Sequence, residues 1–423
     1  MLIKREFERI VKKIGDSAYV GGMTYRQFGE EVKKAGKKLN KNRIVFAEGT
    51  RFEQAVIIFA AFITGKTVVP IAKEYGVKRN ESIVKKCMNT KIPRGIAAIL
   101  FTSGSEGEPK GVLLSERALL RNVKAISDYM GENRRKIAIL RPLVHSAVFT
   151  GELLFAVLHG WDVTFWEKSF FPTELCAFLW REHCDVAGMT PTMLRTFIRL
   201  RAAPQLREII LSGERLFPRE AETFSSFLPQ CSFYSVYGLT ECGPRVSALS
   251  PYLFRSFPGS VGKPVTGVKI KIQHGQLLVK SPCQMKGYLD DKQKSRQKKS
   301  HGWIKTGDMA ECDKFGNLYI LGRMDDMIIR AGMNLYPAEI ENIILRCEGI
   351  SECVAYGLEG ECGVRIILEY VGTAAQEDVA AYAVKELPPY LVPQAFYKKQ
   401  TLEKTASGKL VRKKPICFKG EQK

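Results

Sequence analysis

The sequence predicts a layered α/β fold with mainly parallel strands, followed by a smaller α+β unit. The first observation is a strand-like apolar segment at 44–47, a buried helical segment at 52–63 and a β-branched segment at 67–71, with glycines at their junctions. The second is that strand and helix signals keep alternating further along, at 137–140, 151–158, 162–166, 208–211 and 232–237. Such alternation is typical of a mainly parallel sheet covered by helices.

The pattern then changes. Short alternating segments such as VKIKI and QLLVK, separated by Gly and Pro, predict a small antiparallel β subdomain at about 259–323. The chain after it predicts a separate α+β unit, with helices at 337–347 and 377–386, strands in CVAYGL and VRIILEYV, and a Lys-rich tail. We therefore expect an N-terminal domain at 1–323 and a C-terminal domain at 324–423.

Length, composition and charge narrow the class of protein. A chain of 423 residues exceeds what one hydrophobic core usually organises. With 45% hydrophobic and 26% charged residues it resembles an average globular protein, which argues against a disordered or fibrous class. The net charge of +21 favours anionic partners: nucleotides, coenzyme A, an acidic carrier protein, nucleic acid or anionic lipid. The densest basic segment, KQKSRQKKSH at 292–301, has no interleaved aromatic residues to stack bases, so we expect a solvated surface loop and no nucleic-acid partner.

Targeting signals and cysteine patterns indicate a cytoplasmic protein without a transmembrane segment. The chain begins with MLIKREFERIVKK, which has charges where a secretory signal needs an apolar core. The longest apolar stretch, 55–64, is far shorter than the roughly 20 residues that span a bilayer. The 11 cysteines lack C-x-x-C pairs and histidine spacing, which argues against a disulfide framework or a zinc site.

A glycine-rich stretch, FTSGSEGEPKGV at 101–112, follows the apolar segment at 97–101. It does not fit the nucleoside-triphosphate P-loop, because Pro109 stands where the second glycine belongs and Gly111 where the magnesium-binding hydroxyl belongs. Glycine N–H groups, hydroxyls and one lysine would nevertheless suit a phosphate. From the residues alone, a phosphate-binding loop and an ordinary Gly-rich turn both stay open.

This stretch resembles the loop, usually close to TSGTTGxPKG, of adenylate-forming enzymes, the superfamily of acyl-CoA synthetases, adenylation domains and luciferases. Further segments resemble that family's motifs in its order: LSGERL (211–216), VYGLTE (236–241), WIKTGD (303–308), GRMDDMIIRAGMNLYPAEIE (322–341) and KTASGK (404–409). Ordered matches from about Met23 to the C-terminus are far more specific than one loop, so the sequence is identified as a member of this superfamily.

The resemblance implies a chemistry. The enzyme would join AMP from ATP to a carboxylic acid, giving an acyl-adenylate and pyrophosphate, with Mg²⁺ and cationic groups offsetting the charge on the transferring phosphate. The loop would hold the β- and γ-phosphates through Thr102, Ser103, Gly104, Ser105, Gly107 and Lys110.

Other residues take roles by the same resemblance. Lys409 matches the catalytic lysine that contacts the carboxylate and the α-phosphate, although its spacing alone suggests a surface lysine in a basic tail. Glu241 matches the residue that places magnesium, and Thr240 the hydroxyl that meets the α-phosphate; a structural glutamate is the alternative. His145 matches the histidine near the carboxylate pocket, and a structural histidine is its alternative.

The nucleoside and the hinge are assigned in the same way. Asp308 would accept both ribose hydroxyls, a role that suits two acceptor oxygens. Arg323 resembles the arginine near ribose and phosphate, and Asp325 the hinge about which a mobile C-terminal domain rotates. The adenine would lie against Gly213, Glu214, Tyr237 and Gly238. A turn-capping Asp308, an ordinary RMDD turn and a core Tyr237 are the alternatives.

Three departures from the family pattern affect what we expect. Ser105 and Glu106 stand where the family usually has two threonines. A carboxylate beside triphosphate would reduce ATP affinity unless it points outward or helps to hold magnesium. Ala331 replaces one of two paired glycines in a loop that lines the thiol tunnel. The part before the phosphate loop is short, as in compressed relatives that pass the acyl group to a carrier protein.

The leading hypothesis is an AMP-forming acid–thiol ligase that makes an acyl-CoA from ATP, a small carboxylic acid and coenzyme A. Amino-acid-activating relatives usually carry an aspartate just after the position of His145, where Ser146, Ala147 and Val148 follow here, so an aliphatic or aromatic acid is favoured. The alternatives are an acyl- or aryl-AMP ligase that loads the phosphopantetheine of an acidic carrier protein, a binding protein that has lost the chemistry, and a light-emitting oxygenase.

Overall fold

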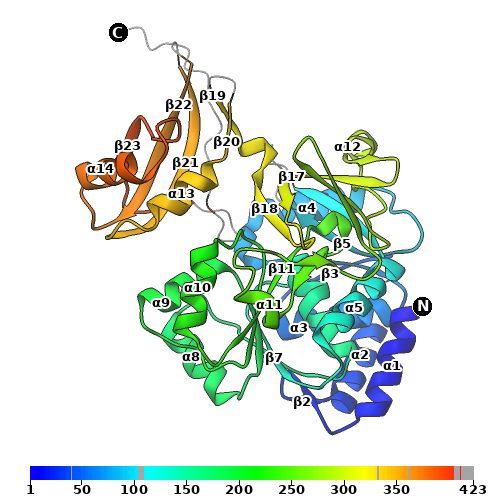
Figure 1. Ribbon diagram of the computed structural model, residues 1–423. Coiled ribbons are helices and arrows are strands. Elements are labelled where there is room, and N and C mark those ends of the chain that lie inside the picture. Colours follow the sequence, from blue (N-terminus) through cyan, green and yellow to red (C-terminus); the bar gives the residue numbers. More distant parts are fainter. Residues whose placement is uncertain (40, 103–108, 331–332, 361–362, 404–409, 411–423) are drawn as a thin grey trace. The chain divides into compact units, whose positions relative to one another are not determined.

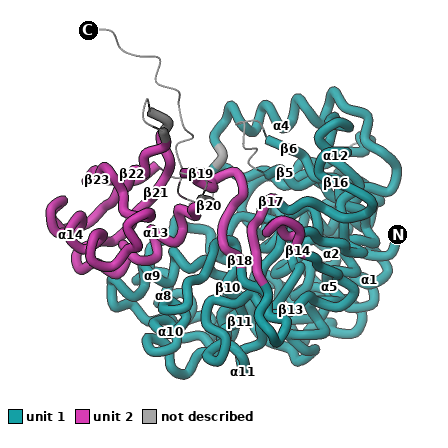
Figure 2. Tube along the Cα trace, turned by 45° about the horizontal axis from the view of Figure 1, so that its top comes forward, with its two compact units in different colours: residues 1–271, 278–306, 312–319 teal, residues 272–277, 307–311, 320–423 magenta. Residues whose placement is uncertain are grey.

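The structure is a computed structural model that describes residues 1–39, 41–102, 109–330, 333–360, 363–403 and 410 (Figure 1). The chain divides into two compact units, which Figure 2 shows in different colours. The large unit comprises residues 1–271, 278–306 and 312–319, and the small unit comprises residues 272–277, 307–311 and 320–423. In the described part of the chain, no helix is long and apolar enough to cross a bilayer.

A nine-stranded sheet organises the large unit, in the order β13-β12-β11-β10-β9-β7-β8-β1-β2. Its strands are β1 (Tyr19–Val20), β2 (Met23–Thr24), β7 (Lys136–Ile139), β8 (Asp162–Phe165), β9 (Val186–Met189), β10 (Glu208–Leu211), β11 (Ser232–Tyr237), β12 (Ser247–Leu249) and β13 (Lys263–Pro264). The strands from β11 through β10, β9, β7 and β8 to β1 pair in parallel, and only the outer pairs are antiparallel. The predicted mainly parallel α/β fold is therefore confirmed.

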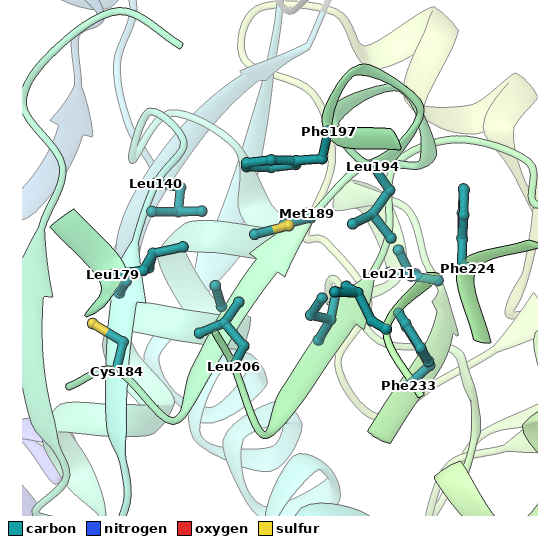
Figure 3. Close-up of a cluster of buried hydrophobic side chains, with 14 of the residues drawn as sticks. Leu140, Leu179, Cys184, Met189, Leu194, Phe197, Leu206, Leu211, Phe224 and Phe233 are labelled. Atoms are coloured by element: carbon teal, nitrogen blue, oxygen red, sulfur yellow. The ribbon is translucent and has the colours of Figure 1, made fainter. Parts of the chain in front are cut away.

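Helices cover both faces of this sheet (Figure 1). On one face lie α8 (Pro172–Arg181), α9 (Pro191–Arg199) and α10 (Pro218–Phe227), and their apolar side chains share a buried cluster with Leu140, Met189 and Leu211 of the sheet region (Figure 3). On the other face α5 (Glu116–Met130) packs against the π-helical turn η2 (Phe149–Leu154), and α1 (Leu2–Ile14) packs against α7 (Phe155–Leu158). The sheet is thus buried on both sides, as its apolar strands require.

A second sheet of the large unit carries the glycine-rich loop. Strands β3 (Ile44–Ala47), β4 (Thr67–Pro70) and β5 (Ile96–Thr102) are parallel, and β6 (Lys110–Ser115) returns antiparallel to β5. Between β3 and β4 runs α3 (Arg51–Ile63), whose N-terminus is fixed by a capping box in which the side chains of Thr50 and Glu53 each accept a backbone N–H of the other. The Phe59 ring of α3 stacks on Phe7 of α1, so these helices share one core.

A five-stranded sheet has the order β14-β15-β17-β16, with β18 paired to β17. Its strands are β14 (Lys269–Gln273), β15 (Gln276–Lys280), β16 (Lys299–Ser300), β17 (Trp303–Cys312) and β18 (Leu318–Arg323). This is the predicted β subdomain. The expectation of a loop at 292–301 was wrong, because Lys292–Lys298 form helix α12. The Asp291 side chain accepts the Lys294 N–H and caps the helix, and none of its residues is buried, so the segment is solvated as expected.

The small unit has the predicted α+β character. Helices α13 (Pro337–Ile344) and α14 (Gln376–Glu386) pack on a three-stranded sheet of β21 (Ile350–Gly360), β22 (Gly363–Gly372) and β23 (Ala395–Lys398). A short hairpin of β19 (Ile328–Arg330) and β20 (Met333–Leu335) precedes them. Fully buried Ile340, Leu368 and Val379 belong to the core cluster of this unit.

Candidate active site

The connections of the nine-stranded sheet change direction at the carboxyl ends of β7 and β9. Strand β7 leads through η2 and α7 to β8 on one side, whereas β9, its other neighbour, leads through α9 to β10 on the opposite side. Open α/β sheets bind ligands at such a switch point, outside the carboxyl ends of the strands. Three residues predicted from their motifs lie at this edge: His145 and Gly213 follow β7 and β10, and Tyr237 is the last residue of β11.

An ion pair that the sequence analysis missed lies at this edge. The Nη2 atom of Arg141, just after β7, donates to Glu152 Oε1 at 2.6 Å and to Ser212 Oγ at 3.0 Å. Glu152 is fully buried, and a Cβ on Gly188 of β9 would come within 2.1 Å of its Oε1. Glycine at 188 therefore makes room for the carboxylate, and the pair ties the segments after β7 and β10 together.

Thr240 and the segment after His145 are brought together. Thr240 begins the 3₁₀ turn η3 (Thr240–Cys242), and its Oγ1 lies 2.9 Å from Ser146 Oγ, so the two hydroxyls share a hydrogen bond. His145, which is half-buried, is the N-cap residue of the short helix α6 (Ser146–Val148). The predicted phosphate-contacting hydroxyl and the predicted histidine thus come from neighbouring segments.

Glu241, the predicted magnesium residue, is 9% exposed and is held by Tyr288. The Tyr288 hydroxyl donates to Glu241 Oε1 at 2.7 Å. Burial, and then the negative charge of Glu241, raise the pKa of Tyr288 well above its usual range, so the phenol stays protonated and donates. The sequence analysis did not identify Tyr288, which lies 47 residues away in the chain.

Gly213 and Glu214 form the turn after β10. Gly213 has φ +92°, a left-handed conformation that favours glycine, and it is exposed. The Glu214 carboxylate accepts hydrogen bonds from Thr192 N at 3.0 Å and Thr192 Oγ1 at 2.7 Å, at the amino end of α9, where a negative charge is stabilised. The Glu214 carboxylate therefore stabilises the start of α9. The contact of this turn with adenine stays a prediction.

Gly238 follows Tyr237 at a point where the backbone passes close to another segment. A Cβ at this position would lie 2.2 Å from the carbonyl oxygen of Pro244 and 3.0 Å from Arg245 N. Because both contacts are with backbone atoms, no change of side-chain rotamer could relieve the clash of a Cβ at this position. Half-buried Tyr237 is fixed next to it by β-sheet pairing with Ser247.

We expect Gly238→Ala to lower the free energy of unfolding by about 1–3 kcal/mol, the usual result of overpacking. Urea denaturation measures the change. Gly322→Ala is the matched control, because its Cβ would meet only Tyr336 Cδ1, at an ordinary 3.7 Å. Equal stability of the two variants would contradict the close approach at Gly238.

Three predicted residues come together in the small unit. Arg323 Nη1 donates to Asp308 Oδ1 at 3.0 Å, and Arg323 Nη2 donates to Asp325 Oδ2 at 3.2 Å. Asp308 is 9% exposed, whereas 44% of the Arg323 side chain is exposed. Gly307, at φ +77°, leaves room for the guanidinium, since a Cβ there would lie 2.9 Å from Arg323 Nη2. This cluster can present an anchored carboxylate and a cation to a polar ligand.

Several predicted residues lie outside the described residues: Ser103, Gly104, Ser105, Glu106, Gly107, Ala331 and Lys409. The described ends of the glycine-rich loop are Thr102, the last residue of β5, and Lys110, the first of β6, which are opposite each other in the antiparallel pair. The backbone at both residues is therefore fixed by one antiparallel strand pair of the large unit.

The residues fit a magnesium ion that arrives with a nucleotide. Within the described ranges, no cluster of three or more His, Cys, Asp or Glu side chains could form a complete metal cage. Magnesium in nucleotide sites usually takes one or two carboxylates and completes its shell with phosphates and water. Glu241, with Oε1 bonded to Tyr288, has a second carboxylate oxygen for this purpose.

A two-unit α/β protein with these segments in this order is typical of an enzyme that binds AMP. The family model "AMP-binding enzyme" matches residues 88–289, and the model "AMP-binding enzyme C-terminal domain" matches residues 339–409. A 2-succinylbenzoate–CoA ligase of Staphylococcus epidermidis is 30% identical over 332 residues, which cover 75% of this chain and 69% of that protein. The chain therefore belongs to the adenylate-forming, AMP-binding enzyme family, as its motifs predicted.

Other relatives show the same likeness. A long-chain-fatty-acid–CoA ligase of Bacillus subtilis is 29% identical over 346 residues. The aligned part covers 75% of this chain and 61% of that relative. The solved o-succinylbenzoate coenzyme A synthetase of Bacillus subtilis with ATP and magnesium has a TM-score of 0.82 at 22% identity, covering 96% of this chain and 98% of that one. A solved anthranilate CoA ligase has a TM-score of 0.85 at 18% identity, covering 96% and 95%. These structures share the fold.

Proposed function

We propose that this protein is an AMP-forming acid–thiol ligase that converts a carboxylic acid to its acyl-CoA. The observation that carries the proposal is the pair Thr240 and Glu241: a hydroxyl hydrogen-bonded to Ser146 beside a nearly buried carboxylate fixed by Tyr288. The pair follows β11 at the carboxyl edge of the sheet, where open α/β sheets usually bind their ligands, and it lies within a family motif. Similar proteins carry the names of CoA ligases for aromatic and fatty acids.

The reaction has two steps. A carboxylate oxygen attacks the α-phosphorus of ATP, and the bond to pyrophosphate breaks. The sulfur of coenzyme A then attacks the acyl carbonyl, loses its proton and displaces AMP. Magnesium bound with ATP supplies charge neutralisation at the phosphates. Coenzyme A and ATP are thus substrates, and magnesium is the cofactor.

The proposed residue roles follow this order. Glu241 holds the magnesium, Thr240 donates a hydrogen bond toward the α-phosphate, and Lys409 stabilises charge in the transition state. The glycine-rich loop with Thr102 and Lys110 takes the β- and γ-phosphates. His145 lies near the carboxylate of the acid.

The proposed contacts of the nucleoside follow the family motifs. Asp308 accepts the ribose hydroxyls and Arg323 lies near ribose and phosphate, while the segments of Gly213 and Tyr237 contact adenine. Residues 324–423 act as a lid domain that turns about Asp325 and carries Lys409. These assignments rest on the family motifs, and the ion pairs of Arg323 with Asp308 and Asp325 support them.

A second candidate is an acyl- or aryl-AMP ligase that loads the phosphopantetheine thiol of an acidic carrier protein. The net charge of +21 favours it, because a strongly basic surface attracts an acidic partner. Both candidates share the adenylation step and differ only in the thiol acceptor.

Acid-dependent exchange of labelled pyrophosphate into ATP tests the shared step. A panel of fatty, aryl and amino acids should give exchange with an aliphatic or aromatic acid. Amino-acid-activating relatives usually carry an aspartate just after the position of His145, but this chain has Ser146, Ala147 and Val148 there. Amino acids should therefore be poor substrates. Product analysis with coenzyme A and with an acidic carrier protein then identifies the acceptor. ATP binding without exchange for any acid would favour a binding protein.

A further inference from the structure

One short segment, residues 285–289, links Glu241 to the strand that follows the glycine-rich loop. Met285 N donates to the Glu241 carbonyl oxygen at 2.8 Å, and the Tyr288 hydroxyl donates to Glu241 Oε1 at 2.7 Å. The segment thereby holds both the backbone and the side chain of the predicted magnesium residue.

The same segment also pairs with β6. Leu289 N donates to Gly111 O at 2.7 Å, Lys286 N donates to Leu113 O at 2.8 Å, and Leu113 N donates to Gly287 O at 3.0 Å. Tyr288 itself forms an antiparallel bridge with Val112. Since β6 starts at Lys110, the backbone of Tyr288 is anchored beside the end of the loop while its hydroxyl reaches Glu241.

The hydrogen bond also sets which carboxylate oxygen is available. Tyr288 is 7% exposed and Glu241 is 9% exposed, so neither group can rely on water to replace a lost partner. With Oε1 engaged by the phenol, Oε2 is the oxygen left to face a cation. A fixed carboxylate orientation matters because magnesium demands near-ideal octahedral geometry at short distances.

We propose that Tyr288 is a positioning residue for the magnesium-bound nucleotide: its hydroxyl orients Glu241, and its backbone couples that carboxylate to the strand that ends the phosphate loop. The inference deepens the proposed function and rests on it. Groups that orient a metal ligand through a hydrogen bond typically change metal affinity or activity by about 10- to 100-fold when removed. A tyrosine that served only the core would leave the metal dependence of ATP binding unchanged.

The chain offers a matched control for the loss of a phenol that bonds a glutamate. In the small unit the Tyr356 hydroxyl donates to Glu369 Oε1 at 3.0 Å, and both residues are buried. None of the predicted site residues takes part in that hydrogen bond. Tyr356→Phe therefore removes the same type of interaction at a place without a proposed ligand.

The test is calorimetric titration of the full-length protein with ATP, once with magnesium and once with chelator. Wild type should bind ATP more tightly with magnesium. We expect Tyr288→Phe to weaken binding about 10- to 100-fold with magnesium and to leave metal-free binding nearly unchanged. Tyr356→Phe should leave both values as in wild type.

A double-mutant cycle separates positioning from general damage to the fold. In the Glu241→Gln background, Tyr288→Phe should have little further effect on magnesium-dependent binding, because both changes act through one carboxylate. The inference is wrong if Tyr288→Phe leaves the magnesium effect intact, weakens both conditions equally, or adds its full effect to Glu241→Gln. A wild-type protein that binds no ATP would instead refute the proposed function itself.

Discussion

Replacing Glu152 with alanine should lower the free energy of unfolding of the large unit by about 3 kcal/mol. Removing one partner of a buried ion pair usually costs about 3–5 kcal/mol, because the other charge stays without compensation. Arg141 keeps 12% of its side chain exposed and can draw on water, so the lower end of that range applies. Arg141 would keep its hydrogen bond to Ser212 but lose its anchor at Glu152, so the turn at Gly213 should become less rigid.

Tryptophan fluorescence during urea denaturation measures this loss, because all 4 tryptophans, Trp161, Trp166, Trp180 and Trp303, belong to the large unit. The matched control is Glu182→Ala, which breaks a partly exposed pair with Lys136 at 3.2 Å and should cost less than about 1 kcal/mol. The double variant Arg141→Met, Glu152→Met should recover much of the stability, since an apolar replacement of the whole pair is often nearly neutral. A loss for Glu152→Ala no larger than for Glu182→Ala would contradict this account.

The strands and most helices could be predicted because each produces a local pattern. The apolar segment that became β7 and the β-branched segment that became β4 are buried strands, and their alternation with helices implies the parallel sheet. Helix α12 was missed because a helix without an apolar face has no periodic signal. Its Lys, Gln and Arg residues are good helix formers, and the Asp291 cap was the remaining clue.

Some residues of the candidate site could likewise be assigned from local sequence, and others could not. Thr240, Glu241 and Asp308 stand in contiguous motifs and could be assigned from sequence, although their roles stay predictions. Arg141 and Tyr288 could not be assigned, because their significance arises from partners distant in the chain. Ser212 lies 71 residues from Arg141, and only the sheet order brings the ends of β7 and β10 to one edge. Pairing across such a distance leaves no mark in one sequence.

The motif KTASGK leads to the largest expected effect on activity. Lys409→Ala should slow acid-dependent pyrophosphate exchange by about 10²–10³-fold, the usual loss when a group that stabilises transition-state charge is removed. If the lysine acts mainly in the transition state, the loss should appear in kcat, with the KM for ATP changed much less.

Lys404 offers the matched control, since it lies in the same basic segment, five positions earlier in KTASGK. Both substitutions remove one positive charge from a chain of net charge +21, so any general electrostatic attraction for ATP falls equally in the two variants. Only a direct role in the reaction would separate them. Exchange rates reduced alike in Lys404→Ala and Lys409→Ala would mean that Lys409 is one more lysine of a basic tail, and the catalytic cation would then have to be sought elsewhere, first at Arg323 in the small unit.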